Sequence, residues 1–80
     1  MPDRLHTANK VVGIKQLRRA VRDGIAEVIY LAEDADPWIR DEVSELAHSA
    51  GLTPVCIPTM QQLGKACGIS VRAAAAAIIK

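Results

Sequence analysis

Aromatic residues are almost absent from this sequence, which has one tyrosine, one tryptophan and no phenylalanine in 80 residues. Modules that read single-stranded RNA by stacking bases on aromatic platforms need several such side chains. Because this sequence has only Tyr30 and Trp38, that class of RNA-binding module is excluded. Cysteine is scarce as well. Cys56 and Cys67 do not have CxxC spacing and lie among apolar neighbours, which favours structural thiols over redox chemistry or a disulfide.

Long apolar runs are also missing. No stretch approaches the roughly 18 to 20 apolar residues of a membrane helix, and no N-terminal segment resembles a secretory signal. We therefore expect a protein of a reducing compartment, placed in the cytoplasm and not in a membrane.

The sequence also lacks a recognisable catalytic or metal-binding set. His6 and His48 are far apart, and Ser49 is the only hydroxyl beside His48, so a nucleophile with its base is not expected. The carboxylates at 33–36 are too few for an oxygen-ligand metal site, and GKACG lacks the spacing of a phosphate-binding loop. We predict no enzyme activity, no cofactor and no metal.

Excess charge is small, with a formal net charge of +1, which argues against a purely electrostatic nucleic-acid binder. The basic and acidic residues are nevertheless separated along the chain. The early basic residues are Arg4, Lys10, Lys15, Arg18, Arg19 and Arg22, and the central acidic ones are Glu33, Asp34, Asp36, Asp41, Glu42 and Glu45. The folded domain should therefore have a basic side and an acidic side.

Hydrophobic patterning predicts alternating strands and helices. Positions 10–12, 27–32 and 55–57 have strand composition, the second as a strand buried on both faces. Helices should begin at Ile14, at Asp36-Pro37 and after Thr59, with Asp36 and Thr59 as capping residues. This order, in a chain of this length, predicts one α/β domain over 1–80.

The C-terminal segment allows two predictions. Five consecutive alanines, 73–77, favour a helix by propensity, whereas Ile78 and Ile79 favour a strand. We choose the strand, because small side chains in a central strand let helices approach both faces of a sheet.

The helix after Gly13 has a basic face. At 100° per residue, Lys15, Arg18, Arg19 and Arg22 fall within an arc of about 100°, roughly opposite Ile14, Leu17 and Val21. No acidic residue follows Lys15 or Arg18 by three or four positions, so a local neutralising partner is lacking there. Gly13 would let an anion approach the helix amides. A solvated face and a bound anionic partner are about equally favoured.

A second candidate contact is the segment Ile69-Ser70-Val71, in the loop before the final strand. Both aliphatic side chains could enter the core, or at least one could be exposed for binding.

Three segments, VVGIKQLRRA, YLAEDADP and LGKACGISVRAAAAAII, in this order resemble the kink-turn-binding ribosomal protein family, the L7Ae and L30e group, and its short bacterial members in particular. The resemblance covers about 10–80. It implies a three-layer α/β/α sandwich with a four-stranded mixed sheet, and binding to a sharply bent RNA element called a kink-turn.

The resemblance also implies the contact residues. The family's common pattern after the glycine has Asn and Glu where this sequence has Lys15 and Gln16, and a Lys where it has Arg19. In the family an aliphatic loop lies against a base flipped out of the kink, and an acidic residue after the second strand, here Glu33 or Asp34, approaches the RNA. The residues implied are Gly13, Ile14, Lys15, Gln16, Arg18, Arg19, Asp34, Ile69, Ser70, Val71 and Arg72.

The function predicted is therefore non-catalytic recognition of kink-turn RNA, in ribosomal RNA or a structured messenger RNA element, by a monomer associated with the ribosome. The alternative is a protein-interaction module that uses the same basic helix face to bind an acidic partner.

Overall fold

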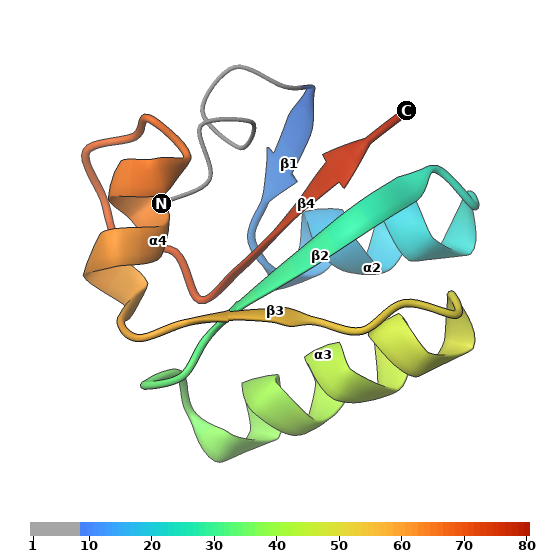
Figure 1. Cartoon of the computed structure of the whole chain (residues 1–80), viewed down its shortest axis with the longest axis horizontal. Helices are drawn as coiled ribbons and strands as arrows, with labels where there is room; N and C mark the ends of the chain where they lie inside the picture. The colour runs from blue at the N-terminus through green and yellow to red at the C-terminus, as the bar shows by residue number, and fades with distance from the viewer. Residues whose placement is uncertain (1–8) are drawn as a thin grey trace.

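The structure, a computed structural model, describes residues 9–80, so Arg4, His6 and the rest of the first eight positions lie outside the described residues (Figure 1). Strands and helices alternate along the chain as the sequence predicts. Their bounds are β1 Lys10–Val12, α2 Ile14–Arg22, β2 Ala26–Ala32, α3 Pro37–Ser49, β3 Val55–Ile57, α4 Met60–Ala66 and β4 Ala75–Ile79.

The four strands form one mixed sheet in the order β1-β4-β2-β3, which confirms the four-stranded mixed sheet. β4 is antiparallel to both β1 and β2, whereas β2 and β3 are parallel. The alanine-rich segment therefore occupies a central position, and the choice of strand over helix was correct. Its backbone hydrogen bonds to two neighbours outweigh the small intrinsic preference of alanine for helix.

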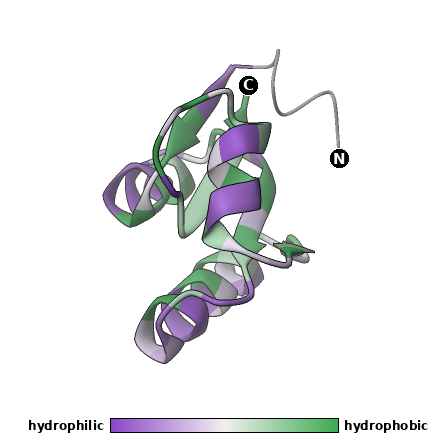
Figure 2. Cartoon of the chain, turned by 90° about the vertical axis from the view of Figure 1, so that its left-hand side faces the viewer, coloured by the Kyte–Doolittle hydropathy of each residue, from purple (hydrophilic) through white to green (hydrophobic). Residues whose placement is uncertain are grey.

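The two faces of the sheet carry separate cores, which makes three layers. On one face, α2 and α3 pack through Leu17 and Val43 against Ile29, Leu31 and alternate alanines of β4. On the other face, α4 packs through Leu63 and Ala66 against residues of opposite parity, such as Tyr30 and Ile78. Figure 2 shows mainly hydrophobic strands between helices whose outer sides are hydrophilic.

The predicted helix caps are confirmed in position but not in every bond. Thr59 precedes α4, and its Oγ1 accepts a hydrogen bond from the Gln62 amide at 3.1 Å. Asp36 occupies the N-cap position of α3 with Pro37 after it, but its side chain makes no capping hydrogen bond. The start of α3 therefore depends on the preset backbone of Pro37.

Two expectations about burial were wrong in part. The strand β2 is fully buried only from Ile29 to Ala32, since Glu27 is exposed and Val28 is half-buried. The thiols also differ, because Cys67 is buried whereas Cys56 is exposed on β3. β3 is an edge strand, so its outer residues have no second strand or helix to cover them.

Within residues 9–80, no helix has both the length and the apolar character required to cross a membrane.

Candidate functional site

The predicted contact segments come together at one end of the sheet. β1 and β2 are oriented alike and β4 runs opposite to both, so the chain leaves β1 and β2 where it enters β4. Two backbone bonds hold this end together: the Gly13 amide donates to the Ala75 carbonyl, and the Ala32 amide to the Ala74 carbonyl, each at 2.9 Å. The start of α2, the loop after β2 and the loop before β4 are therefore neighbours.

Gly13 makes the turn from β1 into α2. Its φ of 102° and ψ of 157° lie in a region that is essentially restricted to glycine. Its amide completes the sheet, and its carbonyl accepts the first helical hydrogen bond, from Leu17 at 2.9 Å. No side chain caps α2, so the amides of its first turn, at Ile14, Lys15 and Gln16, remain available as donors.

The outer face of α2 gathers the four predicted cations. Lys15, Arg18, Arg19 and Arg22 are all exposed, and together they line a shallow hollow of about 270 Å³. On the opposite side Leu17 is fully buried, and Ile14 and Val21 pack against the same core. The helix therefore turns its cations outward together, as its periodicity predicts.

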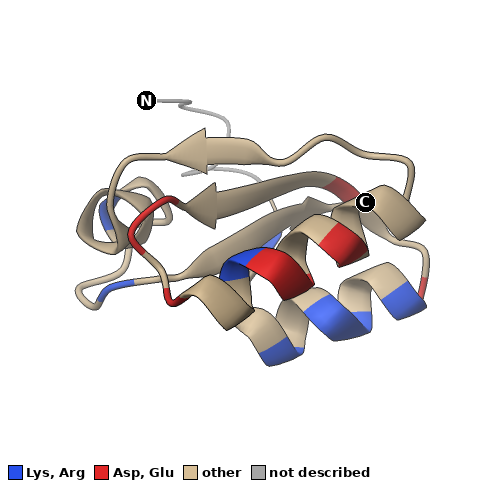
Figure 3. Cartoon of the chain, turned by 90° about the horizontal axis from the view of Figure 1, so that it is seen from below, with Lys and Arg blue, Asp and Glu red and all other residues tan. Residues whose placement is uncertain are grey.

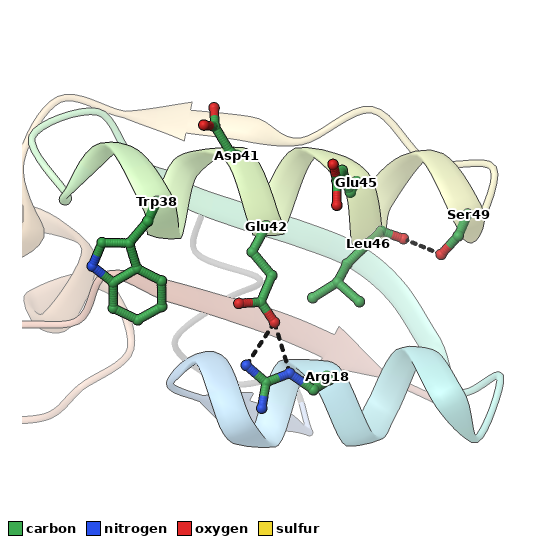
Figure 4. A pocket seen from close by; sticks show the side chains of 7 residues that line it. All are labelled: Arg18, Trp38, Asp41, Glu42, Glu45, Leu46 and Ser49. Atoms are coloured by element: carbon green, nitrogen blue, oxygen red, sulfur yellow. Dashed lines mark hydrogen bonds and ion pairs between the residues drawn. The ribbon is translucent and has the colours of Figure 1, made fainter.

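Two of these four cations have carboxylate neighbours, although no acidic residue follows Lys15 or Arg18 by three or four positions. Arg18 Nε donates to Glu42 Oε2 of α3 at 2.7 Å, and Arg18 Nη2 lies 2.6 Å from the same oxygen (Figure 4). Arg22 Nε lies 3.4 Å from Asp23 Oδ1. Within residues 9–80, no ion pair involves Lys15 or Arg19.

The acidic side of the domain is α3, which lies beside α2. Figure 3 shows Lys and Arg along α2 and Asp and Glu along the neighbouring α3. Between the helices is an open groove of about 580 Å³, lined by Arg18, Trp38, Asp41, Glu42, Glu45, Leu46 and Ser49. Its carboxylates repel phosphate, so an anionic ligand on α2 is favoured over its end and outer face and disfavoured over α3.

The loop before β4 begins with a fixed turn at the end of α4. The Gly68 amide donates to the Lys65 carbonyl at 3.0 Å and the Ile69 amide to the Gly64 carbonyl at 3.1 Å, with Gly68 at φ 79°. These two bonds form the Schellman motif, which ends a helix through a left-handed residue.

The exposure of this loop settles the alternatives left open by the sequence. Val71 is 67% exposed, while Ile69 is half-buried against the core under α4. Ser70 and Arg72 are exposed, and the segment lines a shallow hollow of about 220 Å³ with Gln61 and Lys65. One aliphatic side chain therefore belongs partly to the core, and the other is presented outward.

Asp34 has a structural bond that sequence reasoning missed. Its Oδ1 accepts a hydrogen bond from the Met60 amide at 2.8 Å, so it caps α4 from the loop after β2. No local pattern indicates a cap contributed from 26 positions away; the same holds for the Arg18 and Glu42 pair, 24 positions apart. Asp34 therefore ties the loop after β2 to the start of α4 and still has a second carboxylate oxygen.

Other chemistry is sparse in the described part of the chain. Burial raises the pKa of the Cys67 thiol, and the charge of Lys10 offsets this only partly. The thiol is therefore predominantly protonated at neutral pH and packs as an apolar group. Among residues 9–80, no three His, Cys, Asp or Glu side chains are grouped so that they could hold a metal ion.

Comparisons with known proteins agree with this arrangement. The sequence model described as "Ribosomal protein L7Ae/L30e/S12e/Gadd45 family" matches residues 2–80. An RNA-binding protein of Geobacillus sp. strain WCH70 is 47% identical over 76 residues, which are 95% of this chain and 93% of that protein. The RNA-binding protein YbxF of Geobacillus stearothermophilus is 41% identical over the same shares of the two chains.

Among solved structures, the Giardia lamblia 15.5kD RNA binding protein superposes with a TM-score of 0.81 and 32% sequence identity. The similarity covers 90% of this chain, which spans 61% of the length of the Giardia chain.

Proposed function

This chain belongs to the ribosomal protein L7Ae/L30e/S12e/Gadd45 family, and we propose that it is an RNA-binding protein that recognises kink-turn RNA without catalysis. The observation that carries the proposal is the meeting of the uncapped, basic start of α2 with the exposed loop 69–72 at one end of the sheet. A sharply bent RNA such as a kink-turn could touch both elements at once.

The start of α2 is the proposed base-reading element. In a kink-turn, sheared G·A pairs lie in a locally widened groove, so a helix end reaches base edges that an ordinary A-form major groove hides. The side-chain amide of Gln16 can donate and accept hydrogen bonds there, and Lys15 can reach a phosphate. Gly13 leaves space at this point, since a Cβ built on it would meet nothing within 4 Å.

The cations of α2 are the proposed backbone contacts. Arg19 lies with Lys15 around the same hollow and has no ion pair with a described residue, so it is available to a phosphate without breaking a bond. Arg18 must first leave Glu42. Because the carboxylates of α3 repel RNA, they set the boundary of the bound backbone on that side.

The loop before β4 is the proposed second contact. Val71 is the exposed aliphatic side chain that would lie against the base flipped out of the kink, with Ser70 and Arg72 beside it. Asp34 would approach the RNA through the carboxylate oxygen that does not cap α4. In this proposal only the bent RNA touches both the loop and α2, so binding would shift the RNA toward its bent conformer.

Association with the ribosome is part of the proposal and is supported by the family to which the chain belongs. The partner would be ribosomal RNA or a structured messenger RNA element, bound by a monomer in the cytoplasm.

The test is a titration of the protein against a standard kink-turn and against the same RNA with its sheared G·A pairs replaced. We expect the replacement to abolish tight binding. The logarithm of the association constant should fall with the logarithm of salt concentration, by about 0.7 to 0.9 per phosphate contacted. Equal affinity for both RNAs would refute kink-turn recognition. Failure to bind either RNA, together with capture of an acidic protein by the same α2 face, would favour the alternative interaction module.

A further inference from the structure

Gly64 lies inside α4, where glycine is unfavourable. In a helix interior glycine is destabilising relative to alanine, because it loses more backbone freedom on folding. Four glycines of the described chain, at 13, 24, 51 and 68, adopt positive φ, but Gly64 does not. Its backbone conformation therefore does not require glycine, and another constraint must explain the residue.

That constraint is the closeness of the following loop. A Cβ built on Gly64 would collide with the carbonyl oxygen of Val71, and it would lie 3.1 Å from the Val71 carbonyl carbon and 3.3 Å from Arg72 Cα. All three are main-chain atoms, so no side-chain rotation can relieve the collision. The missing side chain lets the loop main chain lie directly on the helix.

The loop is also fixed at both ends to the same helix. At its start, the Ile69 amide bonds to the Gly64 carbonyl, and at its end the Ala73 amide bonds to the Met60 carbonyl, both at 3.1 Å. The chain thus turns back along α4 between these bonds before it enters β4 (Figure 1). With the loop anchored twice, an added side chain at Gly64 would push its middle, Val71 and Arg72, outward.

We propose that Gly64 is a positioning residue for RNA recognition: it sets the height of Val71 and Arg72 above α4 and so fixes their position relative to the start of α2. The proposal rests on the proposed function, in which one bent RNA touches both elements. A loop displaced from α4 would no longer match the separation that the RNA offers.

The experiment compares Gly64→Ala with Gln62→Ala, an exposed change on the same helix. Gly64→Ala should weaken kink-turn binding by about tenfold, the order expected when an exposed valine loses its buried contact with a ligand. Binding to plain duplex RNA, which depends on the α2 cations, should stay unchanged. Gln62→Ala should leave both affinities as they are.

Amide hydrogen exchange supplies a readout specific to the loop. In Gly64→Ala, the amides of Ile69 and Ala73 should lose protection while those of β4 keep it. Inserting one glycine after Arg72 in Gly64→Ala lengthens the loop, so that it can pass over the added methyl group without strain. The insertion should therefore restore stability, but it should not restore kink-turn affinity, because Val71 and Arg72 remain displaced. If Gly64→Ala does not fold, the insertion variant must fold for the proposal to stand.

Three results would overturn the proposal: unchanged kink-turn binding by Gly64→Ala, loss of protection throughout β4, or failure of both variants to fold. The proposed function fails separately, if the unaltered protein does not distinguish the kink-turn from its G·A-replaced control. In that case exchange at Ile69 and Ala73 still decides whether Gly64 holds the loop.

Discussion

Replacing Glu42 by glutamine should strengthen RNA binding while slightly lowering the stability of the fold. In the free protein, Arg18 Nε and Nη2 both lie within 2.7 Å of Glu42 Oε2, which directs the guanidinium toward α3. A phosphate on the outer face of α2 can recruit Arg18 only if this ion pair breaks. The substitution keeps the size of the side chain and removes the charge that holds Arg18.

The size of the effect follows from exposure. The Arg18 side chain is 51% exposed and that of Glu42 is 28% exposed, so water screens the pair and its contribution should be about 0.2 to 1 kcal/mol. Removing that contribution from the free state should tighten RNA binding by about 1.4- to 5-fold, since about 1.4 kcal/mol corresponds to tenfold. The free energy of unfolding should fall by a similar amount. Opposite signs for binding and stability are the signature of this mechanism.

The assay is a kink-turn titration at fixed salt, with urea unfolding measured on the same proteins. Glu45→Gln is the matched control, because it removes an equal charge from the same helix and groove. Arg18→Ala completes a double-mutant cycle, and in that background Glu42→Gln should change binding little. An equal gain from Glu45→Gln, or a gain that persists without Arg18, would refute the release of Arg18 and indicate general repulsion by α3.

Three further predictions concern single residues. Arg19→Ala should weaken RNA binding and make the slope of the logarithm of the association constant against the logarithm of salt concentration shallower by about 0.7 to 0.9, because one phosphate contact is lost. The melting temperature should stay unchanged. A parallel loss of stability would show that Arg19 is structural. Gly13→Ala should lower the free energy of unfolding by about 1 to 3 kcal/mol through backbone strain alone, because the added Cβ meets no neighbour. An unchanged urea midpoint would contradict this. Asp34→Ala should lower the free energy of unfolding by about 0.5 to 2 kcal/mol, because the cap on α4 is lost. Asp34→Asn keeps an acceptor and should recover most of it, whereas equal losses would show that the charge, not the hydrogen bond, stabilises α4.

The elements of the fold could largely be predicted because their signals are local. The apolar spacing of Ile14, Leu17 and Val21 indicates both the helix and the side that it buries. Thr59 marks the start of α4, and its hydroxyl oxygen accepts a hydrogen bond from the Gln62 amide. Caps and periodicity act within one or two turns of chain, so a single sequence contains them in full.

The alanine segment shows where local reasoning stops. Its intrinsic propensity favours helix, yet Ala75–Ile79 form a strand, since only that arrangement satisfies the facing backbone groups of β1 and β2. The prediction of a strand was correct because it took the whole element order into account. The bounds still differed, with Ala73 and Ala74 preceding the strand.

The sequence by itself determined the polarised helix after Gly13, the alternating elements and the family, because each depends on residue types at short, fixed spacing. Only the tertiary structure decided which groups are available for binding: Arg18 is paired with Glu42, Asp34 caps α4, and Val71 is exposed while Ile69 is half-buried. It also revealed that another stretch of main chain lies against Gly64, where a Cβ would collide with it. These facts depend on pairs of segments that folding brings together, and on distances that spacing along the chain does not specify.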